Sequence, residues 1–218
     1  MDKTKIKELK IKIRKKLDRA LENRKPPHTR LLARMERLEE KLRQSVVISP
    51  FDKVTLSSGK KTSVYIHCKP ILYTADGQFL VGHIINQFLE GQNIQVIGGP
   101  AMGADPIALA VCAMSNFYRK QYNAFSIRKE TKNHGVDSTF CGSVLAGDNV
   151  VLVDDVLTTG NSLRDAAVLV EKQGLVIVQV IVLVDRQEGG KEAIENLGYR
   201  VQSLYTKRQL MRPYWYNI

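Results

Sequence analysis

The residues with the clearest chemical potential are Asp154 and Asp155, which follow the apolar run 150–153. Small and hydroxylated residues come next and lead into a helical segment, 161–173. Ligands of open α/β sheets bind at the carboxyl ends of strands, and the N–H groups of such a loop, with the following helix N-terminus, favour a phosphate. Carboxylates repel phosphate but accept hydrogen bonds from sugar hydroxyls. The segment therefore predicts a site for a ribose phosphate, with donors from Thr158, Thr159, Gly160, Asn161 and Ser162.

The elements that must position this site alternate along the chain. Continuous Val/Ile/Leu runs predict strands that are buried on both faces, and such strands alternating with helices indicate a parallel sheet flanked by helices. We predict an α/β fold of this kind, preceded by two short strands, 54–56 and 64–68, around the turn 57–60. The predicted strands are 94–97, 124–127, 150–153, 175–184 and 200–205, and the predicted helices are 104–119, 161–173 and 190–197.

The charge of +11 on the 218 residues is unevenly distributed. Residues 1–45 hold 16 Lys/Arg and 7 Asp/Glu, whereas the remainder hold 17 and 15. Apolar residues at spacings of three and four predict an amphipathic helix over 4–22 and a second helix capped by Thr29. We therefore expect a basic helical extension, 1–45, and a globular domain, 46–218.

Composition also restricts the setting of the protein. No apolar run reaches the length that spans a bilayer, and the N-terminus is too charged for a secretory signal. The three cysteines are odd in number and scattered, which argues against a disulfide framework or a CxxC zinc site. These features predict a cytoplasmic protein without a membrane segment.

Three further segments follow predicted strands and carry charged residues or glycines. Residues 128–135 combine cations with a histidine and a glycine, and a loop of this kind can close on an anionic leaving group. Residues 98–106 hold a glycine-rich turn, with Asp105 as the expected cap of the next helix. Residues 185–190 end the longest apolar run, and the guanidinium of Arg186 suits a carboxylate.

Together these motifs resemble the type I phosphoribosyltransferases, which use phosphoribosyl pyrophosphate (PRPP), and most closely the orotate phosphoribosyltransferases. The resemblance covers residues 46–205 and implies that family's fold, with a central parallel sheet, a small hood and here an N-terminal helical extension. It implies transfer of the phosphoribosyl group of PRPP to orotate, giving orotidine 5′-phosphate and pyrophosphate. It also implies a homodimer with shared active sites, and Mg²⁺ held through PRPP, with Asp154 and Asp155 reaching the ion through water.

The resemblance assigns roles to individual residues. Asp154 and Asp155 are expected to hold the ribose, and Arg186 to read the base. The residues expected to bind pyrophosphate are Arg128, Lys129, Lys132, His134, Met102 and Gly103. The residues expected to cover the base are Lys60 and Tyr65.

Four positions of the expected hood depart from the family pattern. Some members have Lys in place of Ser57, many have Pro-Tyr in place of Ser63-Val64, and many have Asp in place of His67. Transfer to another base therefore stays open as an alternative. Another alternative is a PRPP-sensing regulator whose basic arm, residues 1–45, binds nucleic acid. The arm has acidic residues and apolar faces and lacks aromatic residues, so we favour helix packing for it over nucleic-acid contact.

Overall fold

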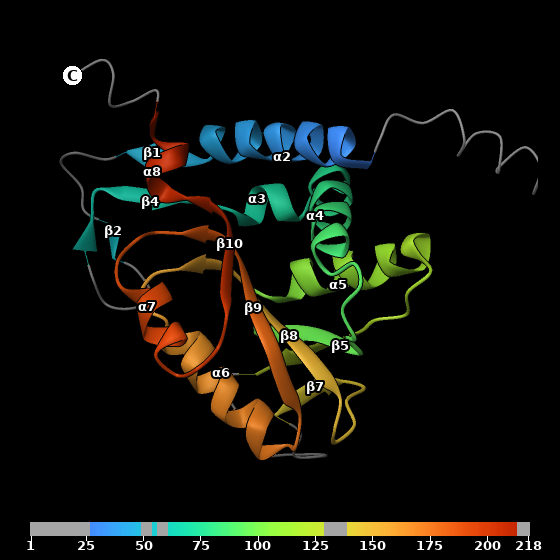
Figure 1. The fold of residues 1–218 in the computed structure, drawn as a ribbon. Helices are drawn as coiled ribbons and strands as arrows, with labels where there is room; N and C mark the ends of the chain where they lie inside the picture. The colour runs from blue at the N-terminus through green and yellow to red at the C-terminus, as the bar shows by residue number, and fades with distance from the viewer. Residues whose placement is uncertain (1–26, 49–53, 56–60, 129–138, 213–218) are drawn as a thin grey trace, which may run out of the picture. The chain divides into compact units, whose positions relative to one another are not determined.

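The computed structural model describes residues 27–48, 54–55, 61–128 and 139–212. The chain divides into two compact units, residues 1–33 and 34–218, with the boundary inside helix α2 (Pro27–Gln44). The second unit contains all of the other described helices and strands (Figure 1). None of the described helices is long and apolar enough to cross a membrane.

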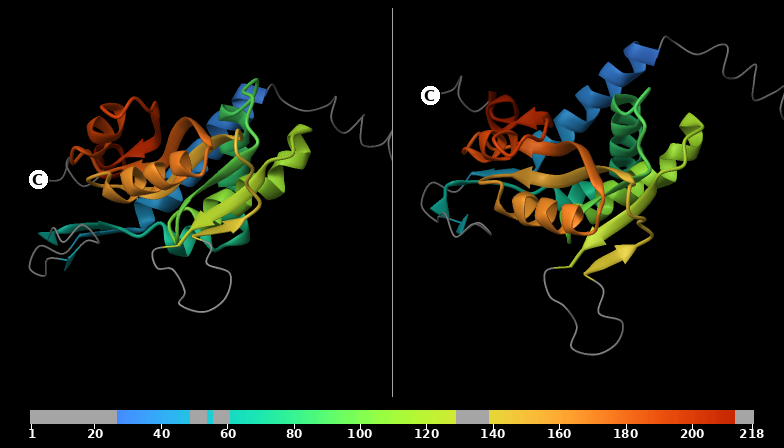
Figure 2. Two further views of the ribbon diagram at one scale, coloured as in Figure 1. Left: turned by 90° about the horizontal axis from the view of Figure 1, so that it is seen from below. Right: turned by 60° about the horizontal axis from the view of Figure 1, so that its bottom comes forward.

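A six-stranded sheet forms the centre of this unit, in the order β10-β9-β8-β5-β6-β7 (Figures 1 and 2). All neighbouring strands are parallel except β6 and β7, which are antiparallel. The strands are β5 (Val96–Pro100), β6 (Asn123–Ile127), β7 (Phe140–Gly142), β8 (Asn149–Leu157), β9 (Val176–Asp185) and β10 (Val201–Thr206). The central strands are nearly continuous in Val, Ile and Leu because both of their faces are buried.

The direction of the chain connections creates a switch point between β5 and β8. The connection from β5 through α5 (Asp105–Ser115) runs to β6, on one side of the sheet order. The connection from β8 through α6 (Asn161–Lys172) runs to β9, in the opposite direction, and α7 (Gly190–Glu195) continues it to β10. Right-handed crossovers that run in opposite directions place their helices on opposite faces. A crevice therefore opens at the carboxyl ends of β5 and β8, where open α/β sheets bind ligands.

Two small antiparallel ribbons precede the sheet. Strand β1 (Val46–Ile48) pairs with β4 (Val64–Ile66), and β2 (Val54–Thr55) pairs with β3 (Lys61–Thr62). A short helix, α3 (Lys69–Leu72), and the longer α4 (Ala75–Phe88) lead from β4 to β5. These ribbons are the small hood of the expected fold.

The second half of α2 packs within the unit that holds the sheet. Leu38 and Leu42 are fully buried, and Asp76 at the start of α4 accepts ion pairs from Arg37 (2.8 Å) and Lys41 (2.9 Å). The last described element, α8 (Lys207–Leu210), is tied to the same helix, because Gln209 Nε2 donates to a Glu39 carboxylate oxygen (3.1 Å). Residues 34–44 are thus part of the compact domain.

The predicted fold class is confirmed, with differences at the ends of elements. Strand β8 continues to Leu157 and so includes both carboxylates, because Asp154 and Leu157 pair with strand β9. The predicted caps are wrong. Helix α5 begins at Asp105 itself, whose side chain makes no capping bond, and α2 begins at Pro27, before Thr29. Helix α4 was not predicted.

Candidate active site

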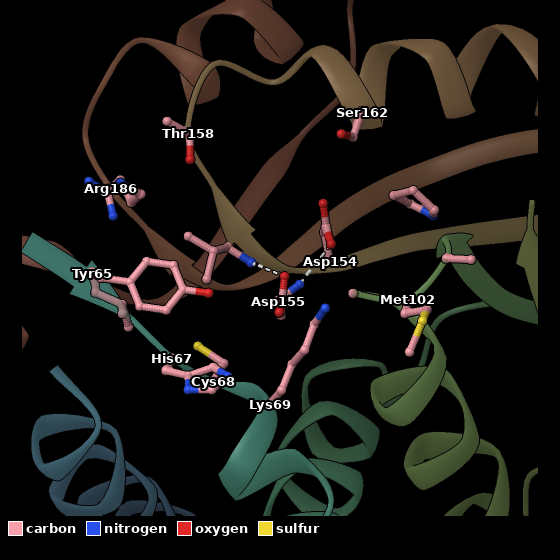
Figure 3. Close-up of a pocket in the computed structure, with 15 residues that line it drawn as sticks. Tyr65, His67, Cys68, Lys69, Met102, Asp154, Asp155, Thr158, Ser162 and Arg186 are labelled. Carbon is pink, nitrogen blue, oxygen red and sulfur yellow. Dashed lines mark hydrogen bonds between the residues drawn. The ribbon is translucent and has the colours of Figure 1, made fainter. Parts of the chain in front are cut away.

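A cavity of about 260 Å³ lies at the switch point. Its floor is the end of β8, with Asp154 and Asp155, and one wall is the loop after β5, with Met102 and Gly103. The opposite wall comes from the hood: residues 65–69 project Tyr65 and Lys69 toward the carboxylates (Figure 3). Arg186, from the end of β9, closes the side nearest Tyr65.

A second, smaller cavity of about 90 Å³ adjoins the first, because Asp154, Thr158 and Ser162 line both. It lies over the loop after β8 and the first residues of α6, where unpaired N–H groups of a helix start favour an anion. Gly160 immediately precedes the helix with a φ of 83°, a left-handed conformation that favours glycine. The structure thus brings together all five predicted phosphate-loop residues, which are Thr158, Thr159, Gly160, Asn161 and Ser162.

The two carboxylates are held by the backbone that follows them. The Asp155 N–H donates to Asp154 Oδ1 (2.9 Å), and the Val156 N–H donates to Asp155 Oδ1 (2.8 Å). Burial raises the pKa of the Asp155 carboxyl above its ordinary value, and the nearby Lys69 ammonium opposes that rise. The site therefore keeps two acidic groups close together at an energetic cost that a ligand's hydroxyl groups can reduce.

Gly103 allows the loop after β5 to approach these carboxylates. A Cβ atom at this position would lie 2.2 Å from Asp154 Oδ1 and 2.8 Å from Asp155 Oδ1, closer than real contacts allow. A residue with a side chain would therefore push the loop away from the floor of the cavity. The absence of a Cβ at Gly103 thus allows this loop to approach the two carboxylates.

Two residues of the cavity, Lys69 and Cys68, were missed in the sequence. Lys69 contributes a cation that acts on Asp155. Burial and the two neighbouring carboxylates raise the pKa of the Cys68 thiol well above its ordinary value, so it is present as the neutral thiol. Their position in the sequence could have indicated them, because they follow the strand that carries Tyr65 by only a few residues.

Arg186 is held by the protein on several sides. Its side chain is almost completely buried, and its Nε and Nη2 atoms donate to Glu188 Oε1 at 3.1 and 2.9 Å. Nη2 also donates to Thr62 Oγ1 (3.1 Å), and Nη1 donates to the Val64 carbonyl (3.0 Å). The edge that carries Nε and Nη2 faces Glu188. Arg186 lines the cavity, and Nη1 keeps one N–H that these contacts do not use.

The remaining predicted residues divide into two groups. Arg128 is exposed at the end of β6 and is not among the residues that line the two cavities described above. The others lie outside the described residues and are Lys60, Lys129, Lys132 and His134.

The residues present fit a magnesium ion that a bound phosphate ligand would share. Among the described residues there is no cluster of three or more His, Cys, Asp or Glu side chains that could hold a metal alone. Magnesium is commonly held by one or two carboxylates together with ligand phosphates and several waters. Asp154 and Asp155 meet that requirement, while a zinc-type cage does not form among these residues.

Residues 73–208 match the family model described as the phosphoribosyl transferase domain. A cavity beside a loop with the predicted phosphate-binding residues, at the switch point of a parallel sheet, is the site expected for that class. An orotate phosphoribosyltransferase of Aquifex aeolicus is 34% identical over 178 residues, which are 82% of this chain and 96% of the relative. The chain belongs to the orotate phosphoribosyltransferase family.

Solved structures agree with this assignment. The Mycobacterium tuberculosis orotate phosphoribosyltransferase in complex with Fe(III) dicitrate is 33% identical, with a TM-score of 0.69 over 81% of this chain and 98% of that chain. The enzyme of the same organism in complex with PRPP is 28% identical, with a TM-score of 0.65 over 81% and 90% of the two chains.

The buried position of Asp155 leads to a prediction about stability. Because its pKa is raised on folding, the folded state favours the protonated form, and stability falls as the pH rises above the ordinary value of 3.8 through the folded-state pKa. Asp155→Asn keeps the acceptor for the Val156 N–H but removes the charge. We expect a higher free energy of unfolding than that of the native chain at pH 7, and convergence of the two near pH 3.

Urea denaturation at the two pH values would measure this difference. Asp165→Asn, at an exposed position on α6, is the control and should change stability little at either pH. An equal difference between Asp155→Asn and the native chain at both pH values would contradict the assignment of the cost to the ionised carboxylate.

Proposed function

We propose that the chain transfers the 5-phosphoribosyl group of PRPP to orotate, giving orotidine 5′-phosphate and pyrophosphate. The observation that carries the proposal is the adjacency of the two cavities: one suits a phosphate on the α6 N-terminus, and the other offers carboxylates for the ribose hydroxyls. The family relatives named above, one of them in complex with PRPP, support the same reaction.

Residues of different charge bind different parts of PRPP. The loop 158–162 holds the 5′-phosphate, and Asp154 and Asp155 accept hydrogen bonds from the ribose hydroxyls. Breaking the bond at the anomeric carbon passes through an oxocarbenium-like state, as in glycosyl transfer generally. The N1 atom of orotate can attack as an anion, so the protein contributes mainly positioning and charge neutralisation rather than proton transfer.

The leaving pyrophosphate would lie between the loop after β5 and the hood. Met102, Gly103 and Lys69 line this part of the cavity. A bound magnesium ion would supply positive charge to the pyrophosphate oxygens. Arg128, Lys129, Lys132 and His134 would add cations as pyrophosphate departs. Tyr65 and Lys60 would cover the base, and Arg186 would recognise it.

The reaction itself is tested by the loss of orotate absorbance. We expect consumption that requires both PRPP and Mg²⁺ and stops when EDTA is added, with hypoxanthine, guanine and uracil left unchanged. Turnover of one of those bases instead would assign the chain to another base. Binding of PRPP without turnover of any base would favour a PRPP-sensing regulator.

Lys132 supplies a separate prediction about the leaving group. If its cation acts mainly in the transition state, Lys132→Ala should lower kcat by about 100-fold while changing the Kd for PRPP by no more than a few-fold. Rapid-mixing kinetics and direct PRPP titration measure the two quantities. Equal losses in kcat and in PRPP binding would assign Lys132 to ground-state binding.

A homodimer is the expected assembly, and helix α5 offers a surface for it. Leu109 on α5 is exposed to 60%, and Phe117, in the 3-10 turn 116–118 that follows α5, is exposed to 61%. Met102, in the loop that lines the cavity, is exposed to 59%. Exposed apolar side chains mark a partner surface where they gather in one patch, and Met102 and Leu109 both belong to the loop and helix that follow β5. A second copy at this surface would lie directly beside the active site, as an enzyme with shared sites requires.

The dimer prediction is tested at Leu109. Leu109→Arg should shift the sedimentation coefficient toward the monomer and lower orotate turnover in parallel, because the sites are shared. Val168→Arg, at an equally exposed position on α6, is the matched control and should change neither property. A fully active monomer would rule out the shared site.

We further propose that residues 46–218 carry the catalytic function and that the helical extension 1–45, of which residues 34–44 pack within the compact domain, makes no nucleic-acid contact. We also propose that the reaction takes place in the cytoplasm. The three free cysteines are consistent with a reducing compartment.

A further inference from the structure

We propose that Glu188 is a positioning residue for orotate: it holds the Nε/Nη2 edge of Arg186 so that the Nη1 corner faces the base. This inference rests on the proposed function, because it concerns the base that Arg186 reads. Four donor contacts of the Arg186 guanidinium carry it, two to Glu188 and two to the hood.

Burial makes a carboxylate necessary at this position. The Arg186 side chain is only 1% exposed, and a buried guanidinium without a paired carboxylate is strongly unfavourable. Glu188 provides the paired charge with one oxygen, Oε1, which accepts from both Nε and Nη2. The guanidinium is planar, so fixing this edge fixes the direction of Nη1 as well.

The loop between the two residues is shaped to bring them together. Gln187 lies between Arg186 and Glu188 and has a φ of 58°, the left-handed conformation that is uncommon outside glycine. Its N–H donates to the buried Asp185 carboxylate (2.7 Å), and its side-chain oxygen accepts from the Arg208 N–H (3.2 Å). The turn is therefore held from β9 and from α8.

Helix α8 also supports Glu188 directly. Lys207 Nζ lies 3.5 Å from the same Oε1 atom that binds Arg186. The carboxylate thus pairs with two cations, which keeps it in place. Because its side chain is only 13% exposed, solvent screens these contacts weakly.

The hood completes the arrangement. Thr62 Oγ1 and the Val64 carbonyl accept from Nη2 and Nη1, and Tyr65 follows directly as part of the cavity wall. One guanidinium therefore links the end of β9 to the hairpin that covers the base. Five N–H groups are available on arginine, and these contacts use four of them. The remaining N–H, on Nη1, is the one left for a substrate acceptor.

A different role for Glu188 predicts an effect of opposite sign. If the carboxylate only occupied Arg186 until the orotate carboxylate displaced it, removing its charge would strengthen orotate binding. If it positions Arg186, removing its charge weakens orotate binding. The direction of the change in the KM for orotate therefore distinguishes the two roles.

Glu188→Gln is the first variant, because it keeps the shape and removes the charge. We expect the KM for orotate to rise by about 10-fold or more, as for loss of a hydrogen bond to a charged group, while the KM for PRPP changes by less than about two-fold. Glu188→Asp, which restores the carboxylate on a shorter arm, should recover part of the loss. Glu195→Gln, on the exposed side of α7, is the matched control and should behave as the native chain.

Thr62→Val is a second variant that leaves the charge pair intact. It removes the Oγ1 acceptor of Nη2 together with the contacts of that hydroxyl to the Val64 N–H and carbonyl. It should raise the KM for orotate in the same direction but by a smaller factor. An unchanged or lowered KM for orotate in Glu188→Gln, with native turnover in the control, would overturn the positioning role. Absence of orotate turnover in the native chain would instead overturn the proposed function itself.

Discussion

The structure depends on keeping two adjacent carboxylates, Asp154 and Asp155, at the buried end of a central strand. Carboxylates in this position lose hydration and repel each other, so their surroundings must compensate. The compensation is local: two backbone N–H groups donate to them, and Lys69 supplies a cation from the hood. In the proposed function, ribose hydroxyls would donate to the same carboxylates and lower the remaining cost.

The strand order makes this arrangement possible. Because the chain leaves β5 in one direction and β8 in the other, no crossover helix covers the gap between their carboxyl ends. Two loops can therefore face each other there. The loop after β5 lies close to the carboxylates at Gly103. The loop after β8 lines the second cavity together with the start of α6. The separation of the two cavity walls, which in the proposed function would hold pyrophosphate and 5′-phosphate, thus follows from the strand order and from Gly103.

The sequence was sufficient for the features that depend on contiguous residues. The buried strands, the phosphate loop and the carboxylate pair each occupy a few neighbouring positions, so periodicity and residue type predicted them. The contacts of Arg186 were not predictable in this way, because Thr62 and Val64 lie 124 and 122 residues away. Helix α4 was missed for another reason. Its buried face includes Gly77, Gly82, His83 and Asn86, which interrupt the spacing of apolar residues that predicts an amphipathic helix.

The same contacts bear on the positions where the hood departs from the family pattern. Val64 accepts from Arg186 through its backbone carbonyl, which a residue of any type supplies. Ser63 lies between Thr62 and Val64, the two hood residues that bind Arg186. These departures therefore leave the hold on Arg186 intact. His67 is different, because its side chain lines the cavity beside Tyr65, with ring centroids 5.6 Å apart. An imidazole in place of a carboxylate leaves this wall with one negative charge fewer. If the base lies beside Tyr65, as the proposed function has it, an anionic base such as orotate meets less repulsion there.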